Sequence, residues 1–583
     1  MKNIKHIIFL SIIFSVLSFP SCQEEVLNKE PVDIITEPAV WNSPELIDAL
    51  VNNLYNQTNF NEVFDEESIL INCTDEARTC FGWSNVLNVF SLGILNPDNT
   101  NSTNTNNPGF AYPAGFPYEE IRGYNEFLKG IDGAKTEGKF KEQRKAEVRF
   151  LRAWTYFNLA MRYGGVPLLT EPQSFNDELY VFRNKEDEIY EFVKTELDAV
   201  VSALPEMQSD ADYARISKYA ALALKSRAML YAASIAKYST MKLDGLLGVP
   251  SSKAQQYFQE SYDASKLIIQ NGPFSLYQKY ADKAKNYQML FLDEGNPEII
   301  LAKQYDGVEK GHDFDFYAQP VGFKFGVPSS INPYLEMVDA YEFADGKPGN
   351  SVNYDQIIDT KTLYENKEPR FHASILYNQS KWLDGEITTH YFSVDSDVKG
   401  KRYIDANSIG KQVNTREAGA TQTGFIIKKY LSEMRDIEAG KSSQDFIVFR
   451  LGEIYLNLAE AAYQLNKPDE ALDAVNIIRE RGGVALRETI DLAKIKHERK
   501  IELAFEGIRF WDLRRWRESS VALTGVFHKL TAYYIRNAGT FGYLIQNAQG
   551  NKSRLFLEQH YYMPFHRKRV IENPNLLQNP GYN

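Results

Sequence analysis

Residues 453–481 read EIYLNLAEAAYQLNKPDEALDAVNIIRER, and this stretch decides the fold class. Its apolar residues return every three to four positions, a period that indicates amphipathic helices. Asn-Lys-Pro-Asp at 466–469 interrupts the pattern with a polar sequence typical of a turn. The stretch therefore predicts two helices folded back on each other, and Ala459 and Ala471 are small enough to let those helices approach closely.

Helix pairs of this kind recur along the chain. The large, small and turn residues of 453–481 stand where tetratricopeptide pairs place theirs, at Tyr455, Leu458, Ala459, Leu465, Asn466 and Ala471. Residues 220–270 form a looser version with an insertion at 240–252. One pair cannot bury its own faces, so we expect the pairs to stack into a curved array.

Short sequence signals predict where several helices begin and end. Ser43 followed by Pro44 predicts an N-cap and a first turn, with Leu46, Leu50 and Leu54 as the apolar stripe. Residues 146–163 are apolar on two faces, which favours a helix packed between neighbours, and a Gly-Gly pair at 164–165 ends it. Further helices are expected over 215–237 and 253–270.

The middle of the chain has a different pattern. Short β-like runs at 298–302 and 446–449 stand among Gly, Pro, Asn and aromatic residues. We therefore predict a mainly α fold, a tetratricopeptide-like helix-pair array with an irregular loop-rich subdomain that carries short β-strands. The predicted parts are a signal peptide at 1–21, a tether at 22–40, an N-terminal helical part at 41–273, the variable subdomain at 274–450 and a C-terminal helical part at 451–583.

The N-terminus is typical of a bacterial lipoprotein signal. Lys2 and Lys5 precede an apolar run at 7–19, which is too short to span a bilayer, and Ser21-Cys22 follows at the expected cleavage point. We expect the Cys22 thiol to carry lipid, including palmitate, and to hold the protein on a membrane outside the cytoplasm. The alternative is an ordinary cleaved signal.

Composition narrows the choice of partners. Lys and Arg number 65 against 77 Asp and Glu, and the net charge of −12 argues against nucleic acid as a ligand. The three cysteines exclude a disulfide scaffold, and whether Cys73 and Cys80 pair is left open. Aromatic residues make up 13% of the chain, enough for a core and a flat binding face.

Sequence motifs for catalysis or metal binding are missing. The chain has no Gly-x-Ser-x-Gly elbow and no phosphate-binding glycine loop, and His497-Glu498 lacks the second histidine of a zinc helix. Asp98, Thr100 and Ser102 faintly resemble a calcium loop without its glycine and glutamate, so only a structural calcium is left open. We predict a non-enzyme, although the acidic residues leave a secreted glycan hydrolase as a minor alternative.

Four separated motifs then resemble one family. They are AEVRFLRAW at 146–154 with RYGGVP at 162–167, VDAY at 338–341 with Asp-Gly at 345–346, RKIELAFEG at 499–507 with RFWDLRRW at 509–516, and NPNLLQNPGY at 573–582. Together with the signal they resemble the SusD/RagB family of Bacteroidetes outer-membrane lipoproteins, in family order along nearly the whole chain. The acidic Gln-Glu-Glu at 23–25 is similar to that family's surface-export signal.

This resemblance implies a function. The family captures glycan at the cell surface without cleaving it and passes it to a SusC-like TonB-dependent transporter in the outer membrane. Capture of peptides, as in RagB-like members, is the alternative binding function. The motif residues are expected to be structural, with Arg149 and Arg152, or Glu502 and Arg509, forming partly buried ion pairs between helices.

A sugar ring stacks on an aromatic face while polar side chains bind its hydroxyl rim, so a site should combine both on loops. Two regions qualify, 75–83 and 312–325, with Trp382 as a weaker third candidate; core packing is the alternative for both regions. The aromatic residues of 312–325 alternate as in an exposed strand or loop with two faces. The resemblance adds that Thr-Asp-Glu-Ala at 74–77 is similar to a family feature near the ligand face. The predicted ligand-binding residues are Asp75, Arg78, Trp83, Phe316, Tyr317, Phe323 and Trp382. The glycan, its linkage and the transporter's identity are not set by the sequence.

Overall fold

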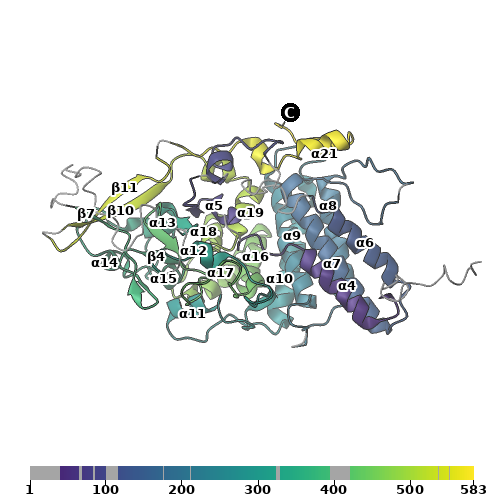
Figure 1. Cartoon of the computed structure of the whole chain (residues 1–583), viewed down its shortest axis with the longest axis horizontal. Helices are drawn as coiled ribbons and strands as arrows, with labels where there is room; N and C mark the ends of the chain where they lie inside the picture. The colour runs from purple at the N-terminus through teal and green to yellow at the C-terminus, as the bar shows by residue number, and fades with distance from the viewer. Residues whose placement is uncertain are drawn as a thin grey trace, which may run out of the picture.

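A computed structural model describes residues 40–582 except 65–67, 83, 85, 100–115, 175, 210–211, 324–328, 394–420, 536–537 and 551. The helical array fills one side of the molecule, and the loop-rich part fills the other (Figure 1). The mainly α prediction is confirmed, because long helices dominate and the strands form small sheets of two or three.

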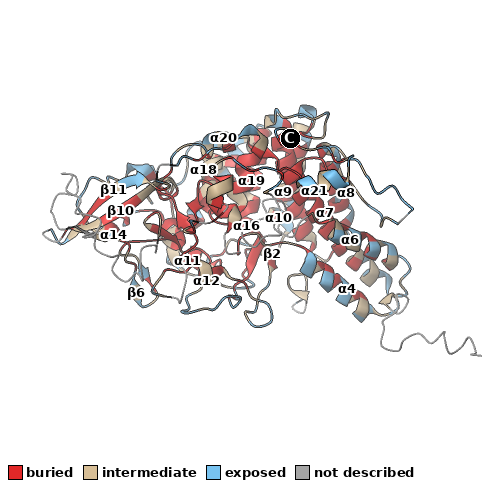
Figure 2. Ribbon diagram, turned by 45° about the horizontal axis from the view of Figure 1, so that its top comes forward, coloured by how far each residue is buried: buried red, intermediate tan, exposed pale blue. Residues whose placement is uncertain are grey.

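The array consists of antiparallel neighbours in chain order. α6 packs on α7, α7 on α8, α8 on α9 and α9 on α10, while α4 lies against α7. Figure 2 shows α7 and α9 buried along most of their length. The bounds are α4 Pro44–Gln57, α6 Tyr118–Ile131, α7 Gly138–Tyr163, α8 Glu186–Val200, α9 Lys218–Tyr238 and α10 Ala254–Asn271.

The helix pair of 453–481 continues this array from a distant part of the sequence. α16 (Leu451–Gln464) packs on α17 (Pro468–Gly482) and, through its other face, on α10. Ala459 and Ala471 are fully buried, and the Asn457 amide donates to the Ser226 hydroxyl at 3.0 Å. The predicted stacking is therefore confirmed, with 274–450 inserted between neighbouring pairs of one array.

The predicted cap at Ser43 and the predicted end at 164–165 agree with the structure, whereas α7 begins at Gly138, before the predicted 146–163, and α9 begins at Lys218, after the predicted 215. The Ser43 hydroxyl accepts from the Leu46 amide at the start of α4, and Gly164 ends α7 with φ +72°. On α4, however, Ile47, Val51 and Leu54 are buried while Leu50 is exposed. The expected stripe is wrong at Leu50, because α7 and α6 cover the helix from a slightly rotated direction.

The loop-rich part contains several two-stranded ladders. The runs predicted as strands form β2 (Ile299–Lys303) and β9 (Phe446–Arg450), which pair antiparallel. The others are β1 (Ala77–Arg78) with β3 (Asn332–Pro333), β4 (Ile375–Tyr377) with β8 (Phe425–Ile427) and β5 (Lys381–Trp382) with β6 (Gly385–Glu386). Short helices lie between them: α5 Ile69–Asn72, α11 Lys283–Met289, α12 Phe314–Ala318, α13 Leu335–Ala340, α14 Thr360–Tyr364 and α15 Pro369–Ser374.

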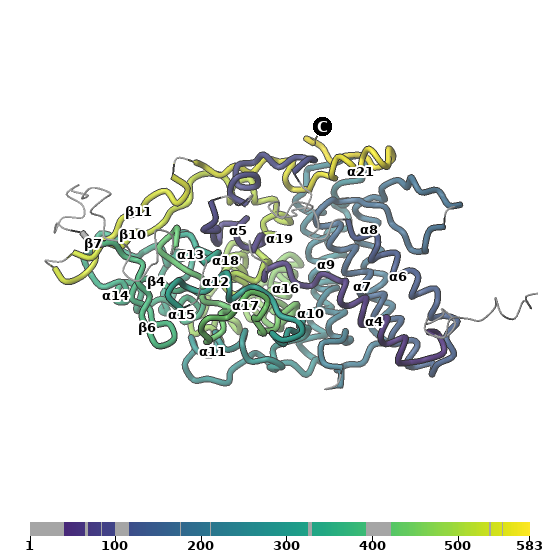
Figure 3. Tube along the Cα trace, in the orientation of Figure 1, coloured from purple at the N-terminus to yellow at the C-terminus, as the bar shows by residue number. Residues whose placement is uncertain are grey.

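The C-terminal part is not wholly helical. After α18 (Leu492–Glu502), α19 (Ile508–Arg515) and α20 (Ser519–Ala522), β10 (His528–Ile535) and β11 (Thr540–Asn547) form a hairpin. β7 (Tyr391–Ser393) adds parallel to β10, so the sheet joins the predicted middle and C-terminal parts. Figure 3 shows the last segment, with α21 (Arg567–Glu572), running beside residues of the N-terminal part, where the Leu555 amide donates to the Ser91 carbonyl.

Buried ion pairs connect the inserted part to the array. We define the buried ion cluster as Glu298, Arg370, Arg450, Arg481, Glu498, Glu502 and Glu506, all of them at most 8% exposed. Glu502 accepts from Arg450 at 2.7 Å and from Arg370 at 3.0 Å, and it also accepts from Arg481. These charges come from α15, β9, α17 and α18, so the motif at 499–507 is a structural junction, as its resemblance implied.

Candidate functional site

Asp75 lies in a structural ion pair immediately before β1. Its carboxylate accepts from Arg509 and Lys500 at 2.9 Å, and the residue is 7% exposed. Burial alone would raise the pKa of Asp75, but the two cations lower it well below its usual range. Next to it, burial raises the pKa of Glu76 to about 8. Asp75 thus anchors the N-terminal segment to α18 and α19. Its carboxylate is occupied by these two ion pairs and is poorly accessible to a ligand.

Arg78 and Trp382 are also buried. Arg78 donates to the Thr79 and Ala548 carbonyls and is 8% exposed, so it holds the end of the β10–β11 hairpin. Trp382, the last residue of β5, is 3% exposed. Ligand contact by these two residues stays a prediction, and their burial argues against it. Trp83 and Cys22 lie outside the described residues.

The aromatic residues of 314–318 form a helical turn, so the prediction of an exposed strand or loop with alternating faces is wrong there. The His312 ring accepts from the Phe314 amide, and the Ser442 hydroxyl accepts from the Asp315 amide. These bonds start α12, which buries Phe314 and Ala318 and leaves Phe316 and Tyr317 half-buried at the surface.

Phe316, Tyr317, Phe323 and Arg435 make up what we call the aromatic face. The rings of Phe316 and Tyr317 stand perpendicular with centroids 5.0 Å apart, and Tyr317 meets Phe81 edge-on at 6.2 Å. The guanidinium of Arg435 lies 4.8 Å above the Phe323 ring. The face therefore combines flat apolar rings, which can stack on a sugar ring, with a charged donor, which can bind hydroxyl groups.

The segment at 434–436 connects α12 to Phe323 within the aromatic face. The Gln319 amide donates to the Met434 carbonyl at 2.7 Å, and the Asp436 amide donates to the Phe323 carbonyl at 3.3 Å. Arg435 also pairs with Asp384 of the β5–β6 turn, and its side chain is still 42% exposed. Sequence reasoning missed Arg435 and Asp384, because charged residues in a polar loop carry no signal until the fold brings them beside a ring.

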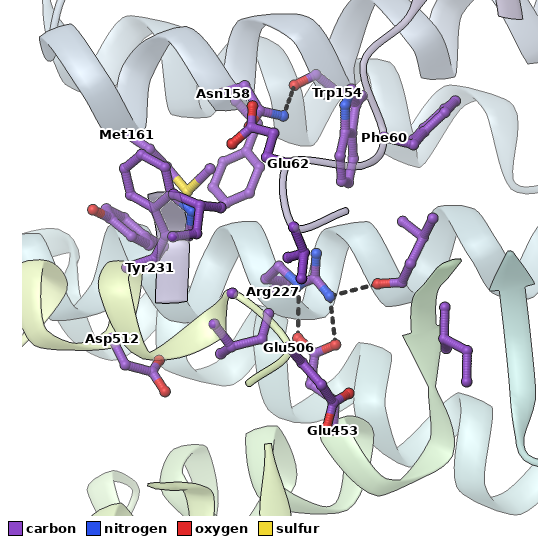
Figure 4. Close-up of a pocket in the computed structure, with 18 of the residues that line it drawn as sticks. Phe60, Glu62, Trp154, Asn158, Met161, Arg227, Tyr231, Glu453, Glu506 and Asp512 are labelled. Atoms are coloured by element: carbon purple, nitrogen blue, oxygen red, sulfur yellow. Dashed lines mark hydrogen bonds and ion pairs between the residues drawn. The ribbon is translucent and has the colours of Figure 1, made fainter. Parts of the chain in front are cut away.

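A small cavity lies where α7, α9 and α16 meet, and its lining indicates a structural role rather than a ligand site. It has a volume of about 80 Å³ and is lined by Trp154, Met161, Tyr231 and other residues of α7, α9 and α16. Figure 4 shows Arg227 turned toward Glu453, with which it forms an ion pair of 2.6 Å. The volume suits a few water molecules, and the charges around it are paired, so we do not assign a sugar to it.

Two further hollows are open to the surface. One, of about 340 Å³, lies between α6, the segment at 167–181 and α21. The other, of about 660 Å³, lies between α4, the segment at 212–215 and β2, and we call it the β2 pocket. Among the described residues, no group of three or more His, Cys, Asp or Glu side chains is arranged to hold a metal ion, and none of the helices is long and apolar enough to cross a bilayer.

Comparison with known proteins agrees with this architecture. Residues 297–582 match the family model described as SusD family, and residues 26–230 match one described as "Starch-binding associating with outer membrane". A curated relative, SusD-like protein P38 of Formosa agariphila, is 25% identical over 70% of this chain and 73% of its own length.

Solved structures show the same fold. A SusD-like protein from Bacteroides fragilis superposes with a TM-score of 0.73 over 95% of this chain and 100% of its own, at 24% identity. A SusD-like carbohydrate binding protein from the same species gives 0.70 over 92% of this chain and 100% of its own, also at 24% identity.

Stacked helix pairs that carry a loop-rich part define the class of proteins built on a helical-repeat scaffold. The two family models together span most of the sequence, and the chain belongs to the SusD/RagB family. SusD-like glycan-binding proteins are non-catalytic.

Proposed function

We propose that this protein captures an oligosaccharide at the bacterial surface and holds it without breaking a bond. The observation that carries the proposal is the aromatic face, which combines the half-buried rings of α12 with a Phe323 ring that lies beneath an exposed arginine. Rings of this kind stack on the C–H faces of sugars, and arginine donates to hydroxyl groups at the rim.

Family membership supports the same ligand class. One matched model is described as starch-binding, and a structural neighbour is described as carbohydrate binding. Aromatic stacking on an open face selects a chemical class rather than one sugar, so the proposal covers oligosaccharides in general.

The anchor and the partner are part of this proposal. Lipid on Cys22 would hold the protein on the outer membrane, a location in line with the description of the N-terminal family model. A SusC-like TonB-dependent transporter in the same membrane would receive the glycan. Modest affinity suffices for this task, because confinement to the membrane raises the local concentration of ligand at the transporter.

The test uses the unlipidated protein, residues 23–583, in native gels cast with candidate glycans. Slower migration together with an absence of released reducing ends supports binding without cleavage. Tyr317→Ala should restore free migration, whereas Tyr180→Ala, an exposed tyrosine remote in sequence from the aromatic face, should not. Released products, or unretarded migration with every glycan of a broad panel, contradicts the proposal.

A further inference from the structure

The β2 pocket has an unbalanced distribution of charge. At its α4 end both acids already have arginine partners: Asp48 pairs with Arg144, and Asp212 pairs with Arg215 at 3.1 Å. Arg215 also binds Glu147 at 2.8 Å. The charges at this end of the pocket are therefore matched within the protein.

At the β2 end two lysines face the same hollow. Lys303 ends β2, and Lys310 follows after a short loop. The Lys310 ammonium donates to the Asn56 side chain at 2.6 Å, which is a neutral partner. Within the described part of the chain, no carboxylate lies within ion-pairing distance of either ammonium group. The nearby carboxylate of Asp306 instead accepts from the backbone amides of Val308 and Lys310 at 2.8 Å.

The position of Lys303 is energetically unfavourable without a counter-ion. Burial lowers the pKa of the Lys303 ammonium to about 8, and the charge of Lys310 adds to that decrease. A partly buried cation beside a second cation loses hydration and gains repulsion, and an anion between the two would relieve both. Amides of Asn52 and Asn56 and the exposed Gln304 line the same pocket and can bind hydroxyl groups.

We propose that the β2 pocket binds the anionic group of an acidic saccharide, a carboxylate or a sulfate ester, between Lys303 and Lys310. The inference rests on the proposed function, because it names the class of glycan. A chain with a net charge of −12 repels an acidic glycan, so binding one requires cations concentrated at the site, as the two lysines are here. Figure 2 shows α4 and β2, which border the pocket, along the same lower side of the molecule.

The pocket can serve the same ligand as the aromatic face. Residues 304–313 lead directly from β2 to α12, and the His312 backbone pairs with Ser442 in an isolated bridge along the way. A glycan that stacks on α12 could therefore extend toward the lysines. A neutral glycan would use the aromatic face alone, and this difference makes the inference testable.

Isothermal titration calorimetry of the unlipidated protein tests it with three probes: an oligogalacturonate, a sulfated galactan oligosaccharide and a neutral oligoglucoside. The double variant Lys303→Gln/Lys310→Gln should weaken the acidic glycan about tenfold or more, as expected for loss of hydrogen bonds to a charged group. Neutral glycan binding should be unchanged. The matched control Lys135→Gln/Lys139→Gln removes two exposed lysines, one between α6 and α7 and one in the first turn of α7, and should change the binding of neither glycan.

The outcomes separate this inference from the proposed function. The acidic probe that binds identifies the source as uronate or sulfate. Wild-type protein that binds only neutral glycan overturns the inference and leaves the proposed function intact. Acidic binding that survives the double variant also overturns it. No binding of any glycan contradicts both, and unchanged circular dichroism of the double variant excludes loss of fold as the reason for weaker binding.

Discussion

Replacing Glu502 by glutamine removes the central carboxylate of the buried ion cluster. One of its oxygens accepts from Arg450 and Arg481 and the other from Arg370, and the residue is fully buried. Glutamine keeps one accepting oxygen, but its NH2 group donates and cannot accept a hydrogen bond, so at least one arginine would face a donor without access to water. Breaking a buried pair in this way costs about 3–5 kcal/mol.

The arginines keep other carboxylate partners, so the loss of stability should lie near the lower end of this range. Arg450 keeps Glu298 and Glu506, and Arg370 keeps Glu368 and Glu498. We therefore expect Glu502→Gln to lower the free energy of unfolding by about 3 kcal/mol at neutral pH. The control Glu470→Gln removes a partly exposed carboxylate bound to Lys266 and should cost less than about 1 kcal/mol.

The same substitution has a pH signature. Burial alone would raise the pKa of Glu502, but the three arginines lower it far below its ordinary value. A depressed pKa stabilises the fold above the unfolded-state pKa of about 4.3, and this contribution is lost as the pH falls from there toward the folded pKa. The difference between wild type and Glu502→Gln should thus be largest at neutral pH and shrink below about pH 4.

Urea unfolding followed by tryptophan fluorescence measures both effects, because the midpoint shifts with stability when the slope is unchanged. A loss for Glu502→Gln no larger than that for Glu470→Gln would refute the reasoning. It would mean that water reaches the cluster and screens its charges.

Three other predictions concern binding and location. Tyr317→Ala should weaken glycan binding by about 1 kcal/mol in calorimetry, roughly fivefold, with only a small change in the thermal midpoint, since the ring is half-buried; a large fall in the midpoint would assign the ring to the core. Affinity for an acidic glycan should fall as pH rises from about 7 to 9, because Lys303 loses its proton near its pKa of about 8, and Lys303→Gln should flatten that profile. Cys22→Ala should move the protein from the membrane fraction to the soluble fraction, and retention there would require another attachment.

The structural features that could be predicted from the sequence are those determined by residues close together in the chain. The helix pair of 453–481 follows from its period, its Asn-Lys-Pro-Asp turn and two alanines, and α17 begins at Pro468 as those signals indicate. The Ser43 cap of α4 follows from one hydroxyl and the proline after it. Each of these features depends on residues within a few positions of one another.

Features that depend on distant partners were not predicted. The β10–β11 hairpin gains its third strand, β7, from more than a hundred residues earlier in the chain, and the C-terminal part was expected to be helical. The start of α12 is fixed by a hydrogen bond to Ser442, whereas its alternating aromatic residues favoured an exposed strand or loop. Long-range hydrogen bonds decided the conformation in both places.

The candidate site was also difficult to predict, because the sequence does not show which charged residues are already paired in the core. Asp75 was predicted to bind ligand and Arg509 to form an ion pair, and in the structure the two residues pair with each other. A side chain whose charge and hydrogen bonds are already satisfied in the core has little left to offer a ligand. We therefore propose that binding depends on side chains outside these buried ion pairs, the half-buried rings of α12 and the two lysines of the β2 pocket. Because these loops lie outside the buried ion pairs, a scaffold of this kind could change its ligand without changing its fold.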